Sequence, residues 1–179
     1  MIFVELQKFV GEVAGAQVWR AALELAGLGR RLYLPISSYP DAELARLFTR
    51  LATLTRRPEA NLIDAFGEKL ARGLLGAHAS LLKPDWRTLD LLENVEDTIH
   101  ATARARDAKA PPPELKCTRV SPSEVEIVYA SQRRLCALAK GLARGIASHY
   151  GELLRIDEPE CMHTGASACR LRCQLVASA

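Results

Sequence analysis

A run of three prolines divides the chain into two parts of different character. Residues 111–113 cannot continue a helix, because proline lacks the amide donor and pushes the residue before it out of the α region. Before this run, apolar residues recur at three- and four-residue spacing, which is typical of amphipathic helices; after it they alternate, as in strands. The sequence predicts helices over residues 2–13, 17–28, 41–55 and 59–75, and a fifth that starts at residues 84–85 and runs to His100 and beyond.

After the prolines, the pattern switches between strands and one long helix. The elements predicted there are strands over 114–120 and 124–129, a helix over about 131–149, and strands over 153–156 and 170–176. This order indicates an α+β fold, in which a helical N-terminal half is followed by a ββαββ antiparallel four-stranded sheet. The chain has 179 residues, of which 49% are apolar, so it can bury its own core, and we predict a single domain over 1–179.

Charge and hydropathy exclude several classes of protein. The 24 Lys and Arg against 21 Asp and Glu leave a net charge of +3, and the arginine pairs are scattered, so no nucleic-acid partner is expected. No run of eighteen apolar residues exists, and Glu5, Lys8 and Glu12 interrupt the N-terminus where a signal peptide would be apolar. We expect no membrane partner and a cytoplasmic protein. Nothing resembles a Ser/His/Asp group or a Gly-rich phosphate loop, so we do not expect an enzyme.

The residues after the predicted second strand suggest an anion-binding group. In an extended segment, Tyr129, Ser131 and Arg133 project to the same side, so two hydroxyls and a guanidinium can converge on one anionic target. The two propionates of haem form such a target, and His100, on a predicted helix, offers the neutral imidazole that is a usual axial ligand of haem iron.

The order and spacing of His100, Pro113 and the Tyr129-x-Ser131-x-Arg133 segment resemble the H-NOX family, the haem-nitric oxide/oxygen-binding domains. The resemblance covers essentially the whole chain. It extends to the N-terminal helix that ends near Gly15 and to the stretches Tyr39-Pro40-Asp41 and Phe66-Gly67-Glu68.

This resemblance implies a gas sensor rather than a catalyst. It implies a ferrous haem b held by His100, with Tyr129, Ser131 and Arg133 on the propionates and Pro113 against the porphyrin. Residues 1–75 would form a helical distal part, and residues 76–179 would hold the proximal helix, the sheet and a cysteine/histidine cluster. In the family, nitric oxide weakens the iron–histidine bond, the helical part moves, and a separate signalling protein, such as a histidine kinase or a cyclic-dinucleotide enzyme, receives the message.

The resemblance also places five aliphatic residues above the iron. Bound dioxygen carries partial negative charge and needs a hydrogen-bond donor, whereas nitric oxide binds ferrous haem tightly without one. We therefore expect the pocket to accept nitric oxide and carbon monoxide and to reject dioxygen. The five residues are Ile2, Leu6, Leu70, Leu138 and Leu142.

A second group of residues suggests zinc. Zinc prefers four tetrahedral sulfur or nitrogen ligands, and clustered cysteines in a chain expected to stay reduced favour a metal over disulfides. Some bacterial H-NOX-like proteins carry a similar zinc cluster, and the resemblance supports Cys136, Cys161, His163 and Cys169 as the ligands. Cys173 is a rival that could replace His163, while Cys117 is interpreted as a small apolar residue in a strand.

The zinc cluster provides an alternative function. The family usually places aromatic residues around the haem, whereas residues 74–82 are aliphatic here, so haem could be weakly held or absent. In that case the chain would be a zinc-thiolate redox-sensing module on an H-NOX-like scaffold, because zinc thiolates release metal and form disulfides on oxidation.

Overall fold

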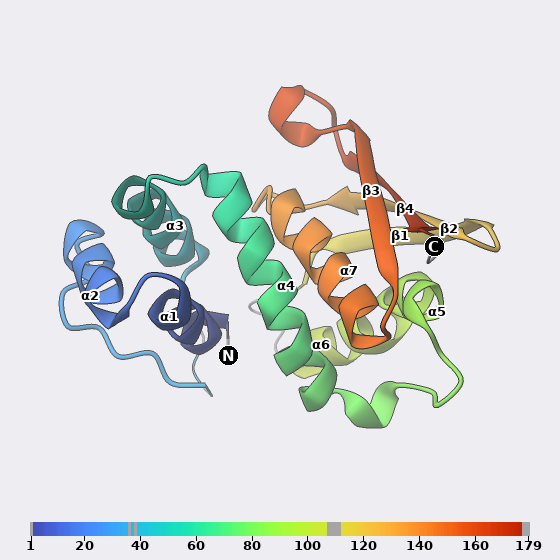
Figure 1. The fold of residues 1–179 in the computed structure, drawn as a ribbon, viewed down its shortest axis with the longest axis horizontal. Coiled ribbons are helices and arrows are strands. Elements are labelled where there is room, and N and C mark those ends of the chain that lie inside the picture. The colour runs from blue at the N-terminus through green and yellow to red at the C-terminus, as the bar shows by residue number, and fades with distance from the viewer. Residues whose placement is uncertain (1, 36, 38, 107–111, 177–179) are drawn as a thin grey trace.

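A computed structural model of the chain describes residues 2–35, 37, 39–106 and 112–176. Six α-helices precede the sheet in these residues, and a seventh lies between its second and third strands (Figure 1). The helices are α1 (Ile2–Val13), α2 (Ala16–Leu25), α3 (Asp41–Thr55), α4 (Glu59–Ala77), α5 (Thr88–Asn94), α6 (Ala101–Arg106) and α7 (Cys136–His149). The short helices are η1 (Ala79–Leu81), η2 (Glu96–His100) and η3 (Met162–Thr164). The strands are β1 (Glu114–Ser121), β2 (Glu124–Ala130), β3 (Leu153–Glu160) and β4 (Cys169–Val176).

The four strands form one antiparallel sheet in the order β1-β2-β4-β3. Strands β1 and β2 form a hairpin, and β4 inserts between β2 and β3 after the η3 turn. The predicted α+β architecture, with a helical half followed by ββαββ, is therefore confirmed. No helix within the described residues is both long and apolar enough to cross a lipid bilayer.

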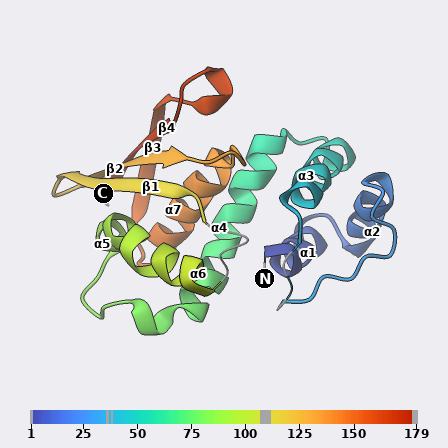
Figure 2. The same ribbon diagram turned by 180° about the vertical axis from the view of Figure 1, so that it is seen from behind.

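The molecule has two apolar cores that meet along α4 and α7. Helices α1–α3 lie on one side of α4, and α7 with the sheet lies on the other (Figures 1 and 2). The first core, among α1–α4, includes Leu6, Phe48 and Phe66, which are almost completely buried. The second core lies between the sheet and helices α4, α5 and α7, and includes Leu91 and Leu171.

Helices α4 and α7 pack with their backbones nearly in contact, and glycines make this possible. A Cβ atom on Gly67 would lie 2.6 Å from the Leu138 carbonyl oxygen, and one on Gly141 would overlap the Asp64 carbonyl. Because backbone atoms cannot move aside as a flexible side chain can, these positions have no room for a side chain.

Several helix boundaries differ from the prediction: α2 ends at Leu25 rather than residue 28, and α5 begins at Thr88 rather than residue 84. Helix α7 begins at Cys136 rather than near residue 131, because Arg134 has a positive φ of 50° and the chain turns before the helix starts. The segment predicted as one helix over 84–100 breaks after α5 and continues as the π-helix η2, in which the His100 amide bonds the Val95 carbonyl five residues earlier.

Candidate functional site

His100 is the last residue of η2, and its imidazole is largely buried. Its side chain is 16% exposed, and Nδ1 lies 2.9 Å from Oε2 of Glu96, one helical turn earlier. Burial lowers the pKa of His100 below its ordinary value, and this outweighs the opposing effects of the Glu96 carboxylate and the Pro113 carbonyl. The imidazole is therefore neutral at pH 7, which is the form that binds iron.

Glu96 accepts two further hydrogen bonds. Arg104 Nη2 lies 2.5 Å from Oε1, and the Leu115 amide lies 3.3 Å from Oε2. Burial alone would raise the pKa of Glu96, but the hydrogen bonds from His100 and Arg104 outweigh it, so the pKa falls below its usual value. Glu96 is not among the residues predicted from the sequence; its spacing of four residues from His100 on a helix is the signal that could have identified it.

Tyr129, Ser131 and Arg133 lie at the end of β2 and in the turn that follows, so they do not share one extended segment as predicted. The Tyr129 hydroxyl is buried and accepts a hydrogen bond from the Leu135 amide at 3.1 Å. Ser131 Oγ accepts one from the Arg133 amide at 3.2 Å, and Arg133 Nε donates to the Asp41 carboxylate at 2.6 Å. The guanidinium is thus already oriented to receive a carboxylate, the same group that a haem propionate presents.

The five aliphatic residues predicted above the iron come together in the first core. They come from α1, α4 and α7; Leu6 and Leu70 are almost fully buried, whereas Ile2, Leu138 and Leu142 are half-buried. Leu142 also packs against the second core, as does Ile99 beside His100. The apolar group therefore reaches the boundary between the two cores.

This donor set matches the chemistry of haem. A neutral buried imidazole suits the iron, half-buried aliphatic side chains suit the porphyrin face, and an arginine that already holds a carboxylate suits a propionate. Pro113, which follows the α6 segment and precedes β1, has its carbonyl against the His100 ring.

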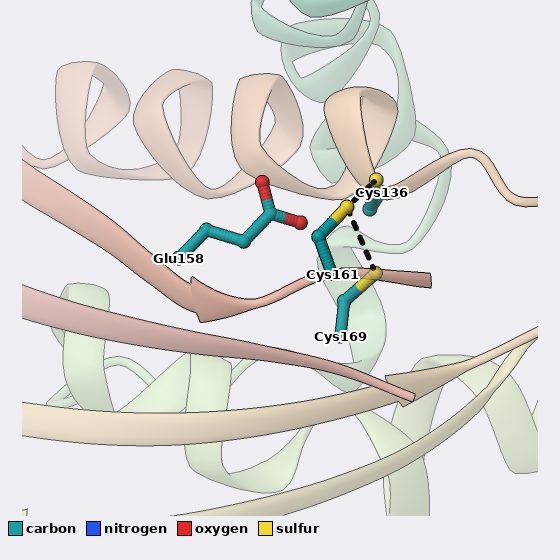
Figure 3. A group of neighbouring side chains, drawn as sticks. All are labelled: Cys136, Glu158, Cys161 and Cys169. Carbon is teal, nitrogen blue, oxygen red and sulfur yellow. Dashed lines mark hydrogen bonds between the residues drawn. The ribbon is translucent and has the colours of Figure 1, made fainter. Parts of the chain in front are cut away.

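Three of the predicted metal ligands come together at a second site. Cys136 begins α7, Cys161 follows β3, and Cys169 begins β4 (Figure 3). The Cys161 sulfur lies 3.9 Å from that of Cys136 and 3.8 Å from that of Cys169. Glu158 completes the group, and one donor atom from each of the four residues lies within 4.8 Å of the others. Such spacing suits a four-coordinate tetrahedral ion.

The Glu158 carboxylate has one oxygen with a partner and one without. Lys140 Nζ lies 2.5 Å from Oε2, whereas Oε1 is buried and has no hydrogen-bond partner among the described residues. Burial raises the pKa of Glu158, but the Lys140 ammonium together with the neighbouring Cys161 and Cys136 thiols outweighs this, and the pKa lies below its ordinary value. A carboxylate that lies beside the thiols (Figure 3) and has one buried oxygen without a partner is the arrangement that a cation would complete.

His163 is not in this group. Its side chain is exposed in the η3 turn, and its Nε2 lies 2.9 Å from the Arg134 carbonyl oxygen. Glu158 takes its place because it continues the inward-facing register of Leu154 and Ile156 on β3, whereas the turn directs His163 outward. We therefore replace His163 by Glu158 in the candidate ligand set. The position of Glu158 on the inward-facing side of a strand is the sequence signal that could have identified it, because carboxylates are seldom buried without a partner.

The two remaining cysteines lie elsewhere in the sheet. Cys173 is fully buried opposite Val125 and Ile156, and Cys117 is half-buried on β1. Burial raises the pKa of each thiol to about 12, so both are protonated and unreactive at pH 7. Neither belongs to the Cys136 group.

Comparison with known proteins gives one consistent result. The sequence profile of the Haem-NO-binding family matches residues 1–158. An H-NOX protein from S. oneidensis in the Fe(II)NO ligation state is 29% identical, with a TM-score of 0.90 over 98% of both chains. The Fe(II)CO form of the SO2144 H-NOX domain from Shewanella oneidensis gives a TM-score of 0.88 at 29% identity, over 99% of this chain and 98% of that one. An unliganded Fe(II) H-NOX protein from K. algicida shares the fold at 17% identity and a TM-score of 0.86, over 99% and 96%. None of the curated proteins matches the chain.

Proposed function

This chain belongs to the Haem-NO-binding (H-NOX) family, and we propose on this basis that it senses nitric oxide and carbon monoxide, but not dioxygen, at ferrous haem b. The observation that carries the proposal is the largely buried, neutral imidazole of His100, which Glu96 holds through Nδ1. Haem supplies the ferrous iron, which binds diatomic gases.

The residues of this chain would hold haem at three places. His100 would bind the iron, Pro113 would pack against the porphyrin, and Tyr129, Ser131 and Arg133 would bind the propionates. Arg133 would exchange the Asp41 carboxylate for a propionate, which preserves its charge-assisted hydrogen bond.

Gas selectivity would follow from the five aliphatic residues. None of Ile2, Leu6, Leu70, Leu138 and Leu142 carries a hydroxyl or N–H group on its side chain. Without such a donor, the partial negative charge of bound dioxygen stays unpaired in an apolar pocket, whereas nitric oxide and carbon monoxide lose nothing comparable.

Signal relay would use the division of the fold into two cores. The distal part, residues 1–75, and the remainder, residues 76–179, would shift relative to each other when His100 is released, and a separate protein would respond. A histidine kinase or a cyclic-dinucleotide enzyme is the partner we propose. A cytoplasmic location, a role as sensor rather than catalyst, and the single-domain boundaries 1–179 stay predictions.

Absorption spectra test the haem proposal. The purified, reduced protein should show a Soret band that shifts with nitric oxide and with carbon monoxide and stays unchanged in air. His100→Ala should lose haem on purification, whereas His149→Ala, an exposed histidine at the end of α7, should keep it. A His100→Ala protein with the wild-type spectrum would show that the ligand assignment is wrong.

A second candidate function rests on the Cys136, Glu158, Cys161 and Cys169 group, for which the unpartnered Glu158 oxygen is the specific support. We propose zinc as the metal, held by three thiolates and one carboxylate. Peroxide would then act as the signal: two thiolates lose two electrons and form one S–S bond, the peroxide takes up these electrons and two protons to give two waters, and zinc leaves. Metal analysis and thiol titration before and after peroxide test this, and zinc without a Soret band would favour it over gas sensing.

A further inference from the structure

Three segments of the chain meet at one carboxylate. Glu96 accepts hydrogen bonds from Nδ1 of His100 in the same π-helix, from Nη2 of Arg104 in α6, and from the backbone amide of Leu115 in β1. Both Oε2 contacts, at 2.9 Å to His100 and 3.3 Å to Leu115, converge on the same oxygen. The carboxylate is half-buried, with 23% of its side chain exposed.

The contact to Leu115 connects the helix to the sheet. Strand β1 is an edge strand, paired only with β2 among the described strands, so alternate amides along it have no partner within the sheet. Glu96 binds one of these amides. Leu115 also lies opposite Tyr129 in the β1–β2 register, so the carboxylate joins His100 to the strand pair that ends at the predicted propionate-binding residues.

The chemistry of the carboxylate determines the state of the imidazole. An ionised carboxylate has no proton to donate, so the hydrogen bond requires the imidazole proton on Nδ1. The nitrogen lone pair is then on Nε2, the atom available to a metal. The Arg104 guanidinium donates to the other oxygen of Glu96, Oε1, at 2.5 Å, and so fixes the carboxylate with Oε2 toward His100.

We infer that Glu96 is a positioning residue for His100, which selects its Nε2-binding tautomer, fixes the ring orientation and ties the histidine to β1. This inference rests on the proposed haem function. Carboxylates that accept a hydrogen bond from a metal-bound histidine also make the imidazole a stronger donor to the metal, so removing Glu96 should weaken the iron–histidine bond.

Resonance Raman spectra of the reduced, ligand-free holoprotein test this. Glu96→Gln removes the charge and keeps the shape, and we expect the iron–histidine stretching band to move to lower frequency. Asp97→Asn is the matched control, because it removes the same charge from the exposed neighbouring residue, and it should leave the band unchanged. An unshifted band in Glu96→Gln, or equal shifts in both variants, would overturn the inference.

A second measurement separates this inference from the proposed function. If the wild-type protein retains no haem, the proposed function fails, and ring ¹⁵N shifts of His100 in the haem-free protein decide the role of Glu96. They should show the Nδ1-protonated tautomer in the wild type and in Asp97→Ala, and a loss of this preference in Glu96→Ala, together with faster exchange of the Leu115 amide. The wild-type tautomer and the wild-type exchange rate in Glu96→Ala would refute it.

Discussion

Nε of Arg133 donates a 2.6 Å hydrogen bond to the Asp41 carboxylate and so connects the turn after β2 to the first residue of α3. The two residues are 92 positions apart in the chain. The Arg133 side chain is 25% exposed and that of Asp41 is 57% exposed, so the pair is partly accessible to solvent. A residue proposed to bind a propionate is therefore already paired with a competing carboxylate.

Replacing Asp41 should change the stability of the fold and the retention of haem in opposite directions. We expect Asp41→Asn to lower the free energy of unfolding by less than about 1 kcal/mol, because exposed ion pairs contribute little. It should also slow haem loss, since the guanidinium no longer exchanges between two carboxylates. Haem transfer to an excess of a scavenging protein measures the rate, with Arg133→Ala as the opposite case that accelerates the loss. Faster loss in Asp41→Asn would show that the pair supports the haem site rather than competing with it.

Adding a single methyl group at the close contact between α4 and α7 should destabilise the protein. Gly141→Ala places its Cβ against the Asp64 carbonyl, so the helices must separate, and we expect a loss of about 2 kcal/mol or more in urea unfolding. Gly76→Ala is the control in α4, where nothing lies within 4 Å of the added atom. It should stabilise the protein by up to about 1 kcal/mol, because alanine favours the helix. Equal effects of the two substitutions would contradict the packing argument.

Bound metal should depend on Glu158 and not on His163. Cys161→Ser and Glu158→Gln each remove one donor, and we expect both proteins to lose most of their zinc, as measured by mass spectrometry of purified protein. His163→Ala and Cys117→Ser should keep wild-type content, because neither side chain is in the group. The Cys136 and Cys169 thiols would also release protons on binding, since burial raises the pKa of both. Zinc loss in His163→Ala would return that histidine to the ligand set.

Glu152 should make stability depend on pH in the acid range. It accepts a hydrogen bond from the Thr88 amide at 3.1 Å and pairs with Arg87 Nε at 3.3 Å. Burial raises the pKa of Glu152, but the hydrogen bonds from Thr88 and Arg87 outweigh it and lower the pKa below the ordinary 4.5. The ionised Glu152 side chain therefore contributes its full share of stability above about pH 4.5, the pKa of the unfolded chain. This contribution is lost as the pH falls through the lower pKa that Glu152 has in the folded protein.

Unfolding of Glu152→Gln tests this dependence. The variant should be about 1 kcal/mol less stable than the wild type at pH 7, and this difference should shrink as the pH falls below 4.5. Asp157→Asn, which loses only an exposed pair with Arg155, should change stability little at either pH. If the difference in unfolding free energy between Glu152→Gln and the wild type stayed constant with pH, the charge of the Glu152 carboxylate would not contribute to stability.

Local patterns in the sequence were enough to predict the order of elements. Periods of two and of three to four residues follow directly from strand and helix geometry, and the prolines at 111–113 mark the change between them, so the α+β architecture follows from neighbouring residues alone. The cysteines at 136, 161 and 169 were grouped instead through the resemblance to H-NOX-like proteins that carry a zinc cluster.

The partners of individual side chains depended on the tertiary structure. Glu158 rather than His163 joins the cysteines because the register of β3 directs the carboxylate inward. Arg133 meets Asp41, and Glu96 meets Leu115, only after helices and strands distant in sequence have packed together. Periodicity indicates which face of a helix or strand is buried. The residue that this face contacts is set by how the elements pack together, and the spacing of residues along one sequence does not give the distances between elements.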